Sequence, residues 1–146
     1  MQEPESKTYM PKPRKPEGYD AQWRPVRVLV VDDEEIVRKL VSQILKSAGY
    51  EVAGEAGDGK RAVDLYKMLH PDIVTLDVEM PFMDGFEALR QILKMNSKAV
   101  VVMLTNVKEK QVVAKIINAG ARDYIIKPIK RQIILAKLRE IRGIPD

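Results

Sequence analysis

Five polar residues in this chain each follow an apolar run, at places where they could do chemistry together. Asp32 and Asp33 follow one run, and Asp77, Thr105 and Lys127 end or follow later ones. Three neighbouring carboxylates repel one another, and a hard divalent cation such as Mg²⁺ relieves that repulsion through oxygen ligands. A metal flanked by a hydroxyl and an ammonium group neutralises charge on phosphoryl oxygens. If these residues converge, Asp77 is the candidate nucleophile, and it would form an acyl phosphate.

Each of these residues also has an ordinary structural explanation when it is taken alone. The run Asp32-Asp33-Glu34 suits the first turn of a helix, Thr105 suits a helix cap, and lysines are usually solvated. Zinc is disfavoured because the chain has no cysteine and its one histidine, His70, ends a predicted helix away from these residues. The hypothesis therefore depends on the elements that bring the residues together.

The remaining pattern predicts five strands that alternate with five helices. Apolar runs indicate strands at residues 26–31, 50–56, 72–77, 99–104 and 123–126. Apolar residues at helical spacing indicate helices over about residues 36–48, 62–69, 86–94, 112–117 and 133–141. Such alternation implies an α/β fold, a doubly wound parallel sheet with helices on both faces.

Strand hydrophobicity predicts the order of this sheet. The first, third and fourth strands are the most apolar and belong in the middle, whereas the second and fifth are more polar or shorter and belong at the edges. This fits the flavodoxin-like order 2-1-3-4-5. In that order, the carboxyl ends of the strands bring all five polar residues to one edge of the sheet.

A glycine-rich stretch from Gly54 to Arg61 formally fits the start of a phosphate-binding loop. Such a loop needs a serine or threonine hydroxyl after its lysine, and Arg61 stands there instead. We therefore interpret the stretch as an ordinary turn between a strand and a helix.

From about Val26 to Arg142 the chain resembles the receiver domain of bacterial two-component response regulators, and within that family the stand-alone, chemotaxis-regulator-like members. The matching motifs are Val-Leu-Val-Val-Asp32-Asp33-Glu34, Leu76-Asp77-Val-Glu-Met-Pro81-Phe-Met-Asp84-Gly85, Met-Leu-Thr105 and Tyr124-Ile-Ile-Lys127-Pro128. The chain departs from the family pattern at Asn106, where a small residue is usual, and in its long N-terminus.

The resemblance implies a role for each site residue. Asp77 would accept a phosphoryl group from the phosphohistidine of a sensor histidine kinase. The implied cofactor is Mg²⁺, bound by Asp33, Asp77 and the backbone carbonyl of Glu79, with Asp32 acting through water. No other cofactor is expected.

Three further features follow from the same resemblance. Lys127 and Thr105 would assist the reaction at the phosphoryl group, and Lys127-Pro128 resembles the family's cis peptide. Thr105 and Tyr124 look like the switch pair, in which the hydroxyl moves toward the phosphate and the ring follows inward. The protein would be a signalling receiver that promotes its own phosphorylation and dephosphorylation, not an enzyme with a separate substrate.

The output is expected on the face formed by the fourth helix, the fifth strand and the fifth helix. An unknown downstream protein would bind there, and the protein would be a monomer or a phosphorylation-dependent dimer. The face is basic, which suits an acidic partner, although such residues also simply solvate amphipathic helices. Its basic residues are Lys108, Lys110, Lys115, Arg122, Lys130 and Arg131.

Residues 1–24 are predicted to be a proline-rich basic tail or linker, and residues 25–143 the receiver domain. The alternative is that Tyr9, Tyr19 and Trp23 dock on the domain or on a partner. The formal charge of +4 comes without a nucleic-acid-binding motif, so no nucleic acid is expected. Without a membrane-length apolar run or a secretory signal, the expected compartment is the cytoplasm.

Two alternatives remain open. The sequence ends just after the fifth helix, which favours a stand-alone switch, and the first alternative is a receiver fragment of a longer regulator. The chain could also be an aspartyl-phosphate phosphohydrolase on a related sheet. Those enzymes place a second aspartate two residues after the nucleophile, and here that position holds Glu79.

Overall fold

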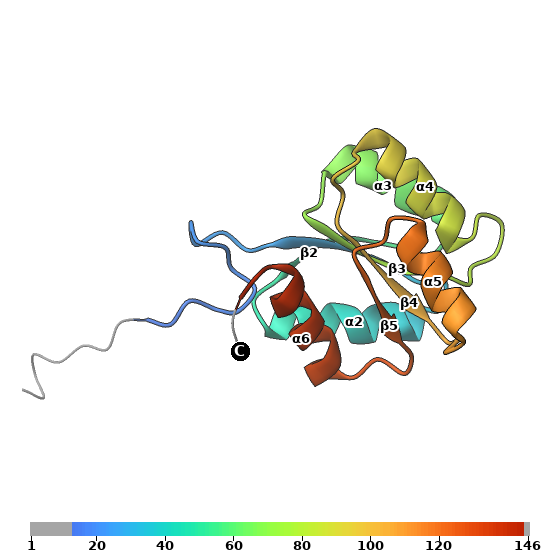
Figure 1. The fold of residues 1–146 in the computed structure, drawn as a ribbon. Helices are drawn as coiled ribbons and strands as arrows, with labels where there is room; N and C mark the ends of the chain where they lie inside the picture. The colour runs from blue at the N-terminus through green and yellow to red at the C-terminus, as the bar shows by residue number, and fades with distance from the viewer. Residues whose placement is uncertain (1–12, 145–146) are drawn as a thin grey trace, which may run out of the picture.

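Five parallel strands form one sheet in the order β2-β1-β3-β4-β5 in the computed structural model, which describes residues 13–144 (Figure 1). This confirms the predicted fold and strand order. The strands are β1 (Arg27–Val31), β2 (Glu51–Ala56), β3 (Ile73–Asp77), β4 (Val101–Thr105) and β5 (Asp123–Ile126). The helices of the described chain are α2 (Glu35–Ser47), α3 (Gly59–Leu69), α4 (Gly85–Met95), α5 (Lys110–Asn118) and α6 (Arg131–Ile141).

The burial of the strands explains their order. Every residue of β3 and β4 is buried, and so are four of the five residues of β1, because helices cover both faces of the middle of the sheet. In β2 only Ala56 is buried. The apolar strands therefore occupy the centre, and the more polar β2 forms an edge.

Side chains that alternate along each strand pack into two separate hydrophobic cores, one on each face of the sheet. Leu29 and Val31 pack with α3 and α4 in the core on one face, whereas Val28 and Val30 pack with α2 and α6 on the other. Figure 1 shows these two layers, with α3 and α4 above the sheet and α2 and α6 below it. This two-sided burial fixes the strands, and with them the loops at their carboxyl ends.

Aspartate caps start two of the helices. The Asp58 side chain accepts a hydrogen bond from the Arg61 backbone N–H at 2.7 Å, and Asp84 accepts one from Glu87 N–H at 3.0 Å. The glycine-rich stretch before Arg61 is thus an ordinary capped helix start, as the sequence predicts.

The described part of the N-terminal segment lies against the domain. The Gly18 backbone N–H donates to the Ala48 carbonyl at 2.7 Å, and the Gly18 carbonyl accepts from Val26 N–H at 2.7 Å. The Arg142 guanidinium, just after α6, donates to the carbonyls of Glu17 at 2.7 Å and Tyr19 at 2.8 Å. The predicted domain boundary at residue 25 stays a prediction, and a truncation there would remove these contacts.

Other parts of the tail prediction, including Tyr9, fall outside the described residues. Among the helices of residues 13–144, none is long and apolar enough to cross a membrane.

Candidate functional site

Three carboxylates meet at the carboxyl edge of the two central strands β1 and β3. Val31 pairs with Leu76, so Asp32 and Asp77, the next residue of each chain segment, lie side by side. Asp32, Asp33 and Asp77 each offer an oxygen atom, and these atoms all lie within 4.8 Å of one another. Asp32 and Asp77 are buried and Asp33 is exposed, so the cluster opens to solvent on one side.

Lys127 supplies the positive charge of the cluster. Its Nζ lies 2.8 Å from Asp32 Oδ2 and 3.3 Å from Asp77 Oδ1, and the side chain is nearly buried. The residue follows β5, the edge strand, and the Lys127-Pro128 peptide is cis, as the resemblance implies. One lysine thus pairs with two of the three carboxylates, and the cluster has more negative than positive groups.

The burial and charges of this cluster shift the pKa values of both Asp77 and Lys127. Burial first, and then the negative charge of Asp32, raise the pKa of Asp77 to about 7, although Lys127 opposes the rise. Burial disfavours the charge of Lys127, but its hydrogen bond to Asp32 and the charge of Asp77 outweigh burial and raise the pKa of Lys127. A cation bound here would offset the electrostatic repulsion among the three carboxylates.

The residues present therefore fit Mg²⁺. The donor set is all oxygen, two of the carboxylates are held in place by burial, and the open side leaves room for water ligands.

Thr105 closes β4, which pairs with β3, and it is fully buried. Its Oγ1 accepts a hydrogen bond from Val107 N–H at 3.0 Å, and its O–H donates to Glu79 Oε2 at 3.1 Å. The backbone N–H of Glu79 lies 3.3 Å from Asp77 Oδ1. The sequence predicts a backbone role for Glu79 in metal binding but not this side-chain contact with Thr105, for which the motif carries no signal.

Tyr124 lies on the same face of the sheet as Thr105. On β5 it pairs with Met103, while Thr105 pairs with Ile126. Side chains at Met103 and Thr105 share a face because they are two residues apart, and the half-buried Tyr124 packs against the core that contains Met103. The two members of the predicted switch pair are thus neighbours on adjacent strands.

Gly85 lets the loop after β3 close tightly on the site. A side-chain carbon at this position would lie 2.2 Å from the carbonyl oxygen of Asp77, closer than any side chain permits. The motif Asp84-Gly85 therefore combines a helix cap with a close backbone approach beside Asp77.

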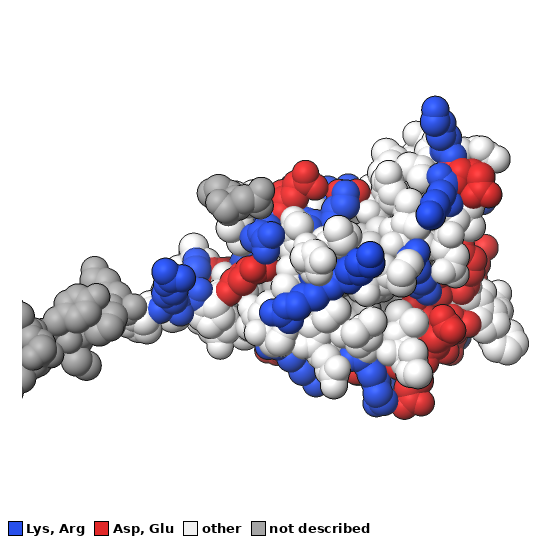
Figure 2. Space-filling model, turned by 90° about the horizontal axis from the view of Figure 1, so that it is seen from below, with Lys and Arg blue, Asp and Glu red and all other residues white. Residues whose placement is uncertain are grey.

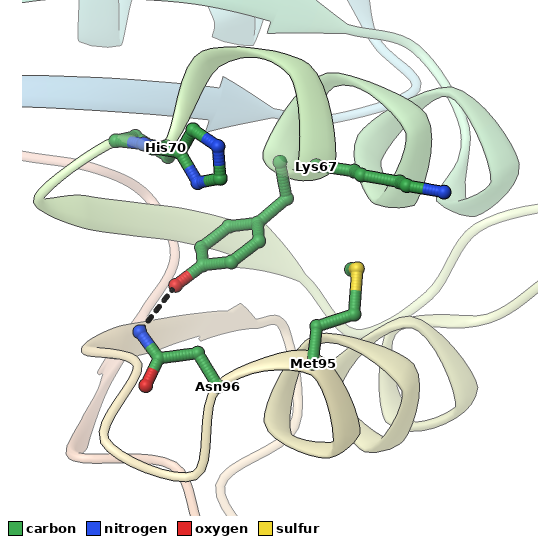
Figure 3. A pocket seen from close by; sticks show the side chains of 6 residues that line it. Lys67, His70, Met95 and Asn96 are labelled. Carbon is green, nitrogen blue, oxygen red and sulfur yellow. Dashed lines mark hydrogen bonds between the residues drawn. The ribbon is translucent and has the colours of Figure 1, made fainter.

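A separate cavity of about 400 Å³ lies at the carboxyl ends of α3 and α4. Figure 3 shows His70 and Lys67 on one side and Met95 and Asn96 on the other, with the Tyr66 hydroxyl hydrogen-bonded to Asn96 at 3.1 Å. None of the residues that line this cavity belongs to the acidic cluster, so His70 does not take part in that site.

A five-stranded parallel sheet of this order, with acidic residues, a threonine and a lysine at its carboxyl edge, defines the receiver class of signalling domains. The chain belongs to the response regulator receiver domain family, which matches residues 28–139. It is a CheY-like receiver domain of two-component signalling.

Several curated relatives resemble the chain over most of their own length. Protein CcdB of Bacillus subtilis is 44% identical over 117 residues, which cover 80% of this chain and 98% of that protein. The chemotaxis protein CheY of Thermotoga maritima is 41% identical over 115 residues, covering 79% of this chain and 96% of the relative. The CheY of Treponema pallidum is 42% identical over 130 residues, covering 88% and 90%.

A solved structure shares both the fold and the sequence pattern. The complex of CheX with CheY, BeF₃ and Mg²⁺ from Borrelia burgdorferi matches with a TM-score of 0.85 and 35% identity, covering 88% of this chain and 98% of that one. That share of this chain is larger than residues 25–146, as it is for the Treponema protein, so both matches include part of the first 24 residues.

Proposed function

We propose that the protein is a phosphoacceptor switch in which Asp77 receives a phosphoryl group from a sensor histidine kinase in a Mg²⁺-dependent reaction. The observation that carries the proposal is the convergence of three carboxylates, one lysine and one buried threonine at the carboxyl edge of the central strands. Each of these groups can serve in phosphoryl transfer. The stability of the fold alone does not require all of them at the same edge of the sheet.

In the proposed step, a carboxylate oxygen of Asp77 attacks the phosphorus of a phosphohistidine. The new O–P bond forms as the P–N bond breaks, and the imidazole nitrogen leaves with the electron pair. Lys127, already 3.3 Å from Asp77, and the hydroxyl of Thr105 would bind the oxygens of the transferred group. Asp33, Asp77 and the backbone carbonyl of Glu79, with Asp32 acting through water, would hold Mg²⁺, which would supply positive charge to those oxygens.

The test is labelling with a small phosphodonor. Incubation with acetyl phosphate and Mg²⁺ is expected to add one phosphoryl group, seen by mass spectrometry, and Asp77→Asn is expected to lose it. Asp64→Asn is a matched control, since Asp64 is an exposed aspartate on α3 that pairs only with Lys60 among the described side chains. Equal labelling of wild type and Asp77→Asn would refute the assignment.

We infer that the output surface is the face formed by α5, β5 and α6. Tyr124, on β5, connects this face to Thr105. The basic residues predicted for this face that lie outside strands, such as Lys110, Lys115 and Arg131, are exposed. Figure 2, which views the α2 and α6 side, shows lysine and arginine side chains spread over that side, interspersed with acidic ones that are more numerous toward one end.

An acidic protein surface would complement this face. The Borrelia relative was solved with CheX in the presence of BeF₃ and Mg²⁺, which supports a partner that recognises the activated state here too. A pull-down that compares beryllofluoride-activated protein with Asp77→Asn tests this. Partners that bind both forms equally would contradict a phosphorylation-dependent output.

A further inference from the structure

The hydrogen bonds of Thr105 assign a position to its single hydroxyl proton. Val107 N–H donates to Oγ1 at 3.0 Å, so the oxygen acts as an acceptor on that side. The O–H itself points to Oε2 of Glu79, 3.1 Å away. Because a threonine hydroxyl has one proton to donate, it cannot serve Glu79 and another acceptor at the same time.

The proposed switch needs that same proton. A phosphoryl group on Asp77 is bound by Thr105 only if the hydroxyl turns its proton toward a phosphoryl oxygen. The Glu79 carboxylate therefore occupies, in this structure, the donor that the phosphoryl group would use. Both are anionic oxygens, so they compete for one donor.

We propose that Glu79 is a latch: its side-chain carboxylate holds the Thr105 hydroxyl in the unphosphorylated arrangement, and the phosphoryl group must displace it. The inference rests on the proposed function of Asp77 as phosphoacceptor. Glu79 is a positioning residue, since it acts through Thr105.

The surroundings of Glu79 suit a contact that is made and broken. Thr105 is fully buried and fixed by its strand, whereas Glu79 is exposed and on a loop, so the carboxylate can move into water. Its backbone N–H already lies 3.3 Å from Asp77 Oδ1, which places the latch beside the phosphoacceptor. A phosphoryl group adds negative charge there, and the repulsion drives the carboxylate away.

The experiment is a titration of the full chain with beryllofluoride at saturating Mg²⁺, followed by calorimetry and by amide NMR of Val107. Glu79→Ala is expected to bind beryllofluoride about threefold to tenfold more tightly than wild type, because no charged acceptor has to be displaced. Glu79→Gln is expected to fall between the two, since its amide oxygen still accepts the bond without a charge. The backbone carbonyl of residue 79 is unchanged in both variants.

Two controls separate the latch from a general charge effect. Glu34→Gln removes the exposed carboxylate next to Asp33 and leaves Thr105 and Glu79 unchanged, and its affinity for beryllofluoride is expected to match wild type. In a Thr105→Ala background, Glu79→Ala is expected to have no further effect on affinity, because the bond is already absent.

Each outcome decides the matter. Equal or weaker binding by Glu79→Ala overturns the latch, and so does an equal gain in Glu34→Gln or an undiminished gain in the Thr105→Ala background. If wild type and every variant fail to bind beryllofluoride with Mg²⁺, the proposed phosphoacceptor function fails instead. The two failures are therefore distinguishable.

Discussion

Val107 lies two residues after Thr105, and its side chain has no polar group that could position a water. Its backbone N–H is hydrogen-bonded to Thr105, and its side chain is apolar and half-buried. Beside it lies the exposed Asn106, which is longer than the small residue usual at this position in the family. In the receiver family, the residues two after the phosphoacceptor and two after the threonine flank the path of the hydrolytic water, and here they are Glu79 and Val107. Hydrolysis requires a water held in line with the phosphorus. We therefore expect a long-lived phosphoryl group.

Val107→Gln is expected to speed dephosphorylation by about threefold to tenfold, because its amide can hold the water. Both proteins are labelled, the donor is removed, and decay is followed in Mg²⁺. Val63→Gln makes the same exchange on α3 and is expected to leave the rate unchanged. A wild-type rate equal to or above that of Val107→Gln would instead indicate that Glu79 orients the water.

Phe82 carries backbone strain in the loop that follows the phosphoacceptor. Its φ is 68°, a left-handed conformation that is unfavourable for a bulky residue, and its ring is fully exposed. Asn adopts this conformation more easily, so Phe82→Asn is expected to raise the free energy of unfolding by about 0.5–1 kcal/mol. Urea denaturation measures it. Phe82→Ala removes the ring but keeps the strain, and a gain equal to that of Phe82→Asn would assign the effect to the ring.

At the scale of residues, the sequence predicts which site groups converge but not how their side chains bond. Asp77 and Lys127 could be placed because strand ends in a parallel sheet meet at one edge, which backbone topology alone determines. The contact from Thr105 to Glu79 could not be predicted, because it depends on the rotamer of an exposed loop side chain. No periodicity in the sequence encodes that rotamer.

At the scale of elements, β4 and β5 lie between the acidic cluster and the proposed output face of α5, β5 and α6. Beryllofluoride with Mg²⁺ is expected to move Tyr124 inward and to shift the amide resonances of Lys110 and Arg122. A ligand shifts such an equilibrium only through different affinities for the two states, and in the proposed switch the hydroxyl of Thr105 would supply that difference. Thr105→Ala is therefore expected to be phosphorylated but to show much smaller shifts.

Thr75 provides the matched control for this prediction. It is a second buried threonine, on β3, and its Oγ1 has no hydrogen-bond partner among the described residues. Thr75→Val should switch like wild type and lose no stability, since a buried hydroxyl without a partner is unfavourable. A Thr105→Ala response equal to wild type would show that coupling does not pass through Thr105.

The elements themselves could be predicted closely where burial determines them. The predicted strand at 123–126 has the observed bounds, and the order of the strands followed from hydrophobicity because helices cover the centre of the sheet on both faces. The strand predicted from Ala99 begins instead at Val101, where pairing with Val74 starts. Pairing partners, not apolar character, decide where a strand begins.

At the scale of the whole molecule, the described part of the N-terminal segment packs against the domain through backbone hydrogen bonds and contacts of Arg142. Removal of residues 1–22 is expected to leave a cooperative fold and Mg²⁺-dependent phosphorylation, because the sheet and both cores lie outside it. Arg142 would lose two carbonyl acceptors, those of Glu17 and Tyr19, and this is expected to lower the free energy of unfolding by about 1–3 kcal/mol. Denaturant unfolding measures the cooperativity and the free energy of unfolding. A loss of cooperativity would show that the segment is part of the core.

Gly18→Ala tests the docking of this segment without shortening the chain. A side-chain carbon at Gly18 would lie 2.2 Å from the backbone nitrogen of Tyr50, so the segment must move away. Trp23, the one tryptophan, lies half exposed in this segment and packs edge-on against Tyr19 with ring centroids 6.4 Å apart, so its fluorescence reports a rearrangement of the segment.

We expect a red-shifted Trp23 emission and a loss of about 1–3 kcal/mol in the free energy of unfolding, with beryllofluoride affinity unchanged. The affinity should hold because the segment joins the amino-terminal end of β1, whereas the acidic cluster lies at its carboxyl end. Gln22→Ala, an exposed change in the same segment, should alter neither quantity. Altered beryllofluoride affinity in Gly18→Ala alone would show that the segment is coupled to the site through the length of the sheet.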